Sequence, residues 1–187
     1  MAMKHPHISS RPRGEDVIAY VISSIRPELD LLRDYDMRQL SPKPKTSQLQ
    51  ALAVEDVRLL AAGLRDVYPA DSLLGVERGD GLIRILETVN QSFAGVELYP
   101  TVEEKAAHLL YFIVKDHPFS DGNKRIATAT FALYLTVNAN TFDNGGPDIS
   151  NNGLAALTLL VAVSDPGEKD VMTDLIERML TGIQPAS

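Results

Sequence analysis

Residues 117–125 separate two apolar stretches of the chain, and this arrangement constrains the fold more than any other feature of the sequence. The nine residues read His-Pro-Phe-Ser-Asp-Gly-Asn-Lys-Arg, whereas residues 126–137 leave almost no polar face. A helix that is apolar nearly all round is buried at the centre of a domain. The sequence therefore predicts a polar loop that leads directly into a central helix.

Hydrophobic periodicity predicts helices along the rest of the chain. Residues 15–40 read as two helical pieces, because Pro27 suits the first turn of a helix better than its interior. Further helices are expected over residues 49–68, 82–93, 154–163 and about 171–180. Thr101 and Glu104 have the spacing of a capping box, and the helix they start is expected to run to about Asp116. The class is all-α, with a loop or a small hairpin over residues 94–100.

Changes in composition along the chain predict its domain organisation. Residues 1–48 contain a polar tail, the helical extension and a linker over 41–48 that is broken by prolines. The main domain is expected over residues 49–182, with a loop rich in Asn, Asp and Gly at 138–149, and residues 183–187 read as a tail.

Charge and cysteine content exclude several classes of protein. The chain has 187 residues and a net charge of −7, which argues against broad nucleic-acid binding and against anionic membranes as partners. The absence of cysteine excludes disulfides, a thiolate nucleophile and a Cys-based zinc site. It is also compatible with a reducing cytosol, so we expect a cytoplasmic location. No apolar run reaches the ~18 residues that a membrane span requires.

The chemistry carried by residues 117–125 points to a phosphate site. At the start of a helix, free backbone N–H groups and the helix dipole both face an anion. Gly122 permits a close approach of these N–H groups or a positive φ. Lys124 and Arg125 oppose the dipole at a cost of about 0.3–1 kcal/mol, which indicates an anion between them. His117 is a candidate general base, because a neutral imidazole accepts a proton near pH 7.

Each of these residues also has a structural explanation. A lone histidine is more often structural than catalytic, and Asp121 can cap a helix as well as bind Mg²⁺. Asn123 can cap the helix or orient a phosphate, and Phe119 is expected to anchor the loop in the core. Because the polar groups converge in one loop, we favour a nucleotide-phosphate site with a histidine beside it.

The loop resembles the signature of the Fic/Doc (Fido) family, which reads His-Pro-Phe-x-Asp/Glu-Gly-Asn-Gly/Lys-Arg. Every residue from 117 to 125 matches it, with Ser120 at the variable position. Residues 97–107 are similar to the branch that includes Doc-like and virulence-associated Fic proteins, and the resemblance covers about residues 49–180. It implies a Fido fold, with the signature between two central helices and a short flap hairpin.

The resemblance also implies a function. Such proteins transfer a phosphate-containing group from ATP, with Mg²⁺, to a hydroxyl of a target protein. His117 would be the general base and Asp121 the Mg²⁺ ligand. The nucleotide phosphates would be held by Gly122, Asn123, Lys124 and Arg125. The flap that aligns the target chain by strand pairing would comprise Val96, Glu97, Leu98 and Tyr99.

Two departures from the family pattern bear on the group transferred. Lys124 stands where many AMP-transferring members have Gly, and Thr128 stands where they have a second Arg. Doc-like members share the Lys and lack that Arg, so the residues lean towards kinase-like phosphoryl transfer. The alternative is AMP transfer (AMPylation), and a second alternative is a catalytically silent Fido binding module.

Regulation is expected from outside the chain. Family members can be inhibited by a helix with the pattern Ser/Thr-x-x-x-Glu-Gly/Asn, whose Glu pairs with the second Arg. Residues 24–28 and 173–177 match only the first part of the pattern, and the Arg is absent, so both read as chance matches. A separate inhibitory partner, as in toxin–antitoxin pairs, fits better. A homo-oligomer is compatible with the sequence, and neither nucleic acid nor membrane is expected as a partner.

Overall fold

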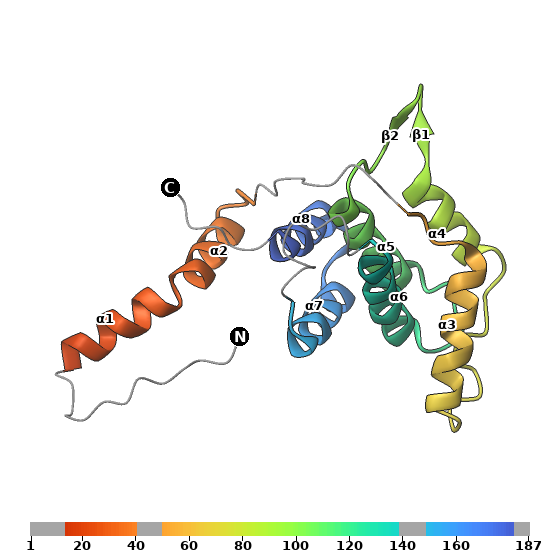
Figure 1. Ribbon diagram of the computed structural model, residues 1–187, viewed down its shortest axis with the longest axis horizontal. Coiled ribbons are helices and arrows are strands. Elements are labelled where there is room, and N and C mark those ends of the chain that lie inside the picture. The colour runs from red at the N-terminus through yellow and green to blue at the C-terminus, as the bar shows by residue number, and fades with distance from the viewer. Residues whose placement is uncertain (1–13, 41–49, 139–148, 182–187) are drawn as a thin grey trace. The chain divides into compact units, whose positions relative to one another are not determined.

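The computed structural model describes residues 14–40, 50–138 and 149–181 (Figure 1). The chain divides into two compact units, one containing the first two helices and the other extending from Leu40 to Gly182. In the first unit, α1 (Gly14–Ser24) and α2 (Arg26–Asp36) are separated at Ile25, and Pro27 lies in the first turn of α2 as predicted. The predicted linker over 41–48, the tail 183–187 and most of the loop predicted over 138–149 lie outside the described residues.

The second unit is mainly helical, which confirms the all-α class with a short hairpin. Its elements are α3 (Val54–Val67), α4 (Gly81–Asn90), β1 (Ser92–Phe93), β2 (Val96–Glu97), α5 (Val102–Asp116), α6 (Asn123–Val137), α7 (Asn151–Val163), the 3₁₀ turn η2 (Pro166–Glu168) and α8 (Lys169–Leu180). Among the described residues, no helix is both long and apolar enough to cross a membrane.

Three predicted helix boundaries are wrong. α3 begins at Val54 and not near residue 49, because Asp56 Oδ2 accepts a hydrogen bond from the Ala53 N–H at 2.8 Å and fixes the first turn there. α4 ends at Asn90 and not at Phe93, because Phe93 pairs with Val96 in the hairpin. α7 begins at Asn151 and not at residue 154, because Ser150 Oγ accepts a hydrogen bond from the Gly153 N–H at 3.0 Å and caps the helix there.

α5 and α6 form the centre of the second unit. Figure 1 shows them between α3 and α4 on one side and α7 and α8 on the other. The sequence pattern marked residues 126–137 as the central helix, but α5 is the more enclosed, since it packs against α4, α6, α7 and α8. Even Glu103 and Lys105 of α5 are buried. The predicted capping box is confirmed, because the Glu104 N–H donates to Thr101 Oγ1 at 3.1 Å and the Thr101 N–H donates to Glu104 Oε2 at 3.0 Å.

The hairpin projects from the junction between α4 and α5 (Figure 1). β1 and β2 are antiparallel, and Ala94 and Gly95 both have positive φ, 52° and 81°, as in a two-residue turn of the type I′ class. Phe93 at its tip is 88% exposed. Lys105, only 2% exposed, fixes the base: its ammonium lies 3.2 Å from Glu97 Oε2 and donates to the Val89 carbonyl at 3.3 Å.

Candidate active site

The loop between α5 and α6 begins and ends with a residue in the left-handed backbone region. His117 follows α5 with φ 48° and ψ 58°, and Gly122 precedes α6 with φ 80° and ψ 11°. Few non-glycine residues adopt this region, although histidine is among those that are enriched there. The two residues turn the chain out of one core helix and into the other, and the His117 side chain is exposed at this turn.

An earlier segment, residues 71–78, pairs with this loop, and we call it the strap. The Gly75 N–H donates to the Asp121 carbonyl at 3.2 Å, and the Arg78 N–H donates to the Pro118 carbonyl at 2.7 Å. In return the Ser120 N–H donates to a carbonyl of the strap, that of Val76, at 2.7 Å. The loop is therefore fixed by backbone pairing that the sequence did not predict.

The strap is itself attached to α3. Gly75 has φ +70°, and a Cβ at that position would lie 2.9 Å from Ala61 Cβ of α3. Arg65 donates to the Leu74 carbonyl at 3.2 Å. Arg58 holds the Glu77 carboxylate at 2.7 and 3.1 Å, and this hydrogen bonding lowers the pKa of Glu77.

Phe119 and Asn123 hold the interior of the loop. Phe119 is completely buried, as predicted for the anchor. Asn123 Oδ1 accepts from the Phe119 N–H at 2.9 Å, and its Nδ2 donates to the Phe119 carbonyl at 2.8 Å. The Asn123 side chain is thus committed to the loop. Gly122 is required for two reasons. Its φ is positive, and a Cβ at this position would lie 2.9 Å from Leu74 Cγ.

The start of α6 has no side-chain cap among the described residues. Gly122 occupies the N-cap position, so Asp121 does not cap the helix and its exposed carboxylate remains beside it. Lys124, in the first turn, is exposed as well. An uncapped helix start leaves its first N–H groups available to an anion or to water.

Arg125 is oriented by residues that local sequence analysis missed. Its guanidinium forms an ion pair with Asp71 of the strap and lies 4.8 Å from the centre of the Tyr68 ring. A second, longer contact of 3.5 Å joins it to Asp121 Oδ2. Asp71 and Tyr68 precede Arg125 by more than fifty residues, so no local pattern marks them. Farther along α6, Thr128 Oγ1 bonds to the Lys124 carbonyl at 2.8 Å and to Thr158 Oγ1 at 2.9 Å.

The predicted flap residues lie in and after β2. Val96 and Glu97 form the strand, and Leu98 and Tyr99 connect it to α5. Tyr99 packs against the domain, because its ring stacks on His108 with 3.8 Å between ring centres. His108 has a structural role: its Nδ1 bonds to the Glu104 carbonyl at 2.8 Å, and burial lowers its pKa to about 4.

Comparison with known families assigns the region around the loop to a family. Residues 44–135 match the sequence profile of the Fic/DOC family. This stretch is a Fic/DOC family domain. The Fic/DOC domain includes the strap, the hairpin, α5, the whole loop 117–122 and nearly all of α6, and the helical architecture is consistent with the Fic fold. No curated protein and no solved structure matches the chain.

The carboxylates of the Fic/DOC domain bear on metal binding. In the described part of the chain, no three His, Cys, Asp or Glu side chains are grouped so that they could hold a metal ion. Mg²⁺ commonly takes one or two protein carboxylates and completes its shell with phosphate oxygens and water. The exposed carboxylate of Asp121 is of the type that supplies such a ligand.

Proposed function

We propose that the Fic/DOC domain transfers the terminal phosphoryl group of ATP to a hydroxyl of a target protein. One observation carries the proposal: the loop holds an exposed histidine at one end and an uncapped helix start, preceded by a left-handed glycine, at the other. A base and an anion-binding position at the two ends of a fixed loop suit transfer of a phosphate-containing group. The family of the domain supports the same class of reaction.

The residues of the loop would have distinct roles in this reaction. His117 takes the proton of the target hydroxyl while the hydroxyl oxygen forms a bond to the γ-phosphorus. The bond between the γ-phosphorus and the bridging β-phosphate oxygen breaks, and ADP is released. The first-turn N–H groups after Gly122 and the Lys124 ammonium hold phosphate oxygens. Arg125, already oriented by Asp71, has guanidinium N–H groups left to donate to a phosphate. Asp121 would hold Mg²⁺, which neutralises phosphate charge when bound.

The environment of Thr128 favours phosphoryl transfer over AMP transfer. Its hydroxyl is engaged with the Lys124 carbonyl and with Thr158, so it offers no free donor to further phosphates at that turn of α6. AMP transfer would need the α-phosphate at the reacting position, with the β- and γ-phosphates held beyond it. In the alternative reaction His117 plays the same part, but pyrophosphate leaves.

The hairpin is the proposed docking element for the target chain. In a two-stranded sheet each strand has one edge without a partner strand, and an extended peptide can pair with such an edge. Phe93, Val96 and Leu98 are 88%, 69% and 51% exposed and would supply side-chain contacts. Inhibition would come from a separate antitoxin-like chain, because Glu177 of the partial inhibitory pattern lies near Glu104 of α5 and not at the loop.

The test is transfer from ATP labelled separately at the α- and γ-phosphates, with Mg²⁺, in a cell lysate. We expect γ-label on protein with the wild type and a loss of about 10²–10⁴-fold with His117→Ala, the range attributed to a general base. Ser120→Ala is the matched control, because Ser120 lies in the same loop at the variable position. Label from the α-phosphate would establish AMP transfer. No label from either position would favour a silent binding module, and label that survives His117→Ala would refute the assigned base.

A further inference from the structure

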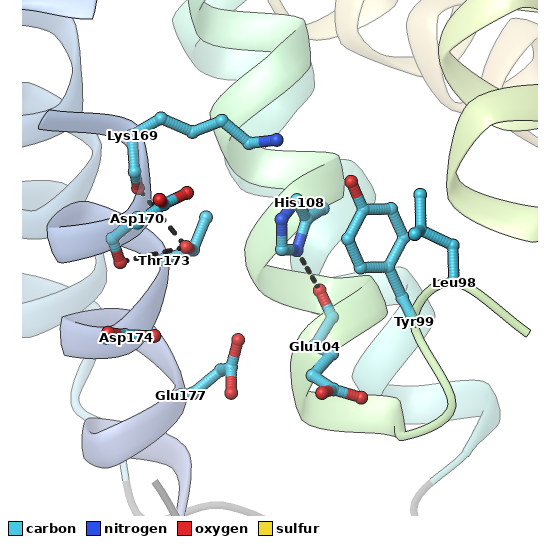
Figure 2. Close-up of a pocket in the computed structure, with 9 residues that line it drawn as sticks. All are labelled: Leu98, Tyr99, Glu104, His108, Lys169, Asp170, Thr173, Asp174 and Glu177. Carbon is cyan, nitrogen blue, oxygen red and sulfur yellow. Dashed lines mark hydrogen bonds between the residues drawn. The ribbon is translucent and has the colours of Figure 1, made fainter. Parts of the chain in front are cut away.

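A cavity lies beside α5 and α8, towards the opposite end of α5 from His117 (Figure 2). Its volume is about 360 Å³. Its lining residues are Leu98, Tyr99, Glu104, His108, Lys169, Asp170, Thr173, Asp174 and Glu177. Glu104 and His108 precede His117 by several helical turns, about 14–20 Å along α5 at 1.5 Å per residue. The cavity is therefore separate from the loop 117–125, although Leu98 and Tyr99 of the predicted flap form part of its lining.

Glu177 is the feature of this cavity that calls for a ligand. Only 6% of the residue is exposed, and Figure 2 shows its carboxylate directed from α8 into the space before α5. Within the described part of the chain, this carboxylate has no hydrogen bond and no ion pair. Its charged neighbours, Glu103, Glu104 and Asp174, are all acidic. A buried carboxylate that meets only like charges is costly, and a donor with positive charge would remove that cost.

The other walls of the cavity also accept hydrogen bonds. The Glu104 carbonyl can only accept, so the His108 Nδ1 that bonds to it carries the proton and Nε2 is left as an acceptor. Figure 2 shows that second ring nitrogen on the side facing α8. The stacked rings of Tyr99 and His108 add a flat aromatic surface. Lys169 is the one basic residue in the lining, and its ammonium lies 4.9 Å from the centre of the Phe112 ring.

We propose that this cavity binds an organic cation, an alkylammonium or guanidinium group, with Glu177 as its counter-ion and the Tyr99 side of the cavity as its apolar wall. Acceptors on several sides together with an aromatic surface match a planar or alkyl cation that donates several hydrogen bonds. A metal ion fits less well, because no three metal-binding side chains come together in the described residues. A free amine and the side chain of a partner's Lys or Arg present the same chemistry.

The protonation of Glu177 gives the proposal a distinctive signature. Burial, reinforced by the acidic neighbours, raises the pKa of Glu177 to about 8. A cation beside it would lower that pKa, so binding near pH 7 should release a proton and the affinity should rise with pH. The ionisable groups around Glu177 are Glu103, Glu104 and His108 of α5, Lys169, Asp170 and Asp174 of α8, and Tyr99 of the connection from β2. His108 stays neutral in this pH range, since its pKa is lowered to about 4.

The test is calorimetric titration of the full chain with agmatine, with spermidine and with the blocked peptide acetyl-Ala-Arg-Ala-amide. We expect binding to the wild type and a loss of about tenfold or more in affinity with Glu177→Gln. Wild-type binding should be tighter at pH 8.5 than at pH 7 by about eightfold, since more Glu177 is ionised there. The control is Glu87→Gln, which removes the same charge from an exposed position of α4. Asp174→Asn is a second variant and should also weaken binding.

The order of the measured affinities identifies the source of the cation. Binding of agmatine or spermidine that is tighter than binding of the peptide would assign the cavity to a free amine. The reverse order would assign it to a side chain of a partner polypeptide. The proposal is overturned if no probe binds the wild type at millimolar concentration, or if folded Glu177→Gln and Glu87→Gln bind the probes as the wild type does. Circular dichroism of each variant establishes that it is folded.

Discussion

The buried carboxylate of Glu177 should make the stability of this protein depend on pH in a predictable direction. In the folded chain its pKa is raised from 4.5 to about 8, chiefly by burial and further by Glu104 and Asp174. Below pH 4.5 the carboxyl is protonated in both the folded and the unfolded chain. As the pH rises towards 8 the unfolded chain ionises first, so the contribution of Glu177 to stability falls and reaches its minimum above pH 8.

The substitution Glu177→Gln removes this dependence. The interval from 4.5 to about 8, at about 1.4 kcal/mol per pKa unit, corresponds to a ceiling of about 5 kcal/mol in the free energy of unfolding. Because the cavity opens to water, we expect about 2–4 kcal/mol of this to be realised. The variant should therefore equal the wild type near pH 4.5 and exceed its stability by about 2–4 kcal/mol at pH 9.

Urea unfolding followed by circular dichroism, at a series of pH values from about 5 to 9, measures this difference. The control Glu87→Gln, on the exposed side of α4, should give a difference that does not change over the same range. If the difference between Glu177→Gln and the wild type is independent of pH, the carboxyl does not titrate as its surroundings imply. The electrostatic description of the cavity would then be wrong.

Three further predictions follow from particular contacts. Gly122→Ala should lower the free energy of unfolding by about 1–3 kcal/mol, because Gly122 has a positive φ and the new Cβ would clash with Leu74. The control Gly63→Ala, in open space on α3, should raise the free energy of unfolding by about 0.5–1 kcal/mol. Equal effects of the two substitutions in urea unfolding would contradict the loop geometry. Asp71→Asn should change the free energy of unfolding by less than about 1 kcal/mol, because the ion pair with Arg125 is partly exposed. It should nevertheless reduce label transfer from ATP by about tenfold, because the Arg125 guanidinium is no longer positioned. Unchanged transfer would show that Asp71 is not part of the site. Lys105→Met should lower the free energy of unfolding by about 1–3 kcal/mol and accelerate chymotryptic cleavage after the exposed Phe93. A cleavage rate equal to that of the wild type would show that Lys105 does not fix the hairpin.

Much of the fold follows from local patterns in the sequence. Apolar spacing located the α-helices that the structure describes, and Thr101 with Glu104 set the start of α5 because a capping box satisfies two backbone donors within one turn. Pro27 separated α1 from α2 for an equally local reason, the loss of its N–H. Boundaries of α3, α4 and α7 were missed. Side-chain hydrogen bonds fixed the starts of α3 and α7, and a hairpin strand ended α4, without any change in the apolar pattern.

The candidate active site was only partly predictable. Residues 117–125 are contiguous, so the base, the glycine and the cations could be assigned together from their order. Their alternative structural roles could not be separated in the same way. Only the structure gives the N-cap position to Gly122, commits the Asn123 amide to Phe119 and engages the Thr128 hydroxyl with Thr158.

The sequence by itself determined which segments are helical and which short loop carries phosphate-type chemistry, because both depend on residues close together along the chain. Tertiary structure decided how that loop is held and what surrounds the buried charges. The pairing of the strap with the loop, the contact of Asp71 with Arg125 and the enclosure of Glu177 by α5 each join residues distant in sequence. Such contacts arise from the packing of whole helices, and a local pattern of residues contains no information about them.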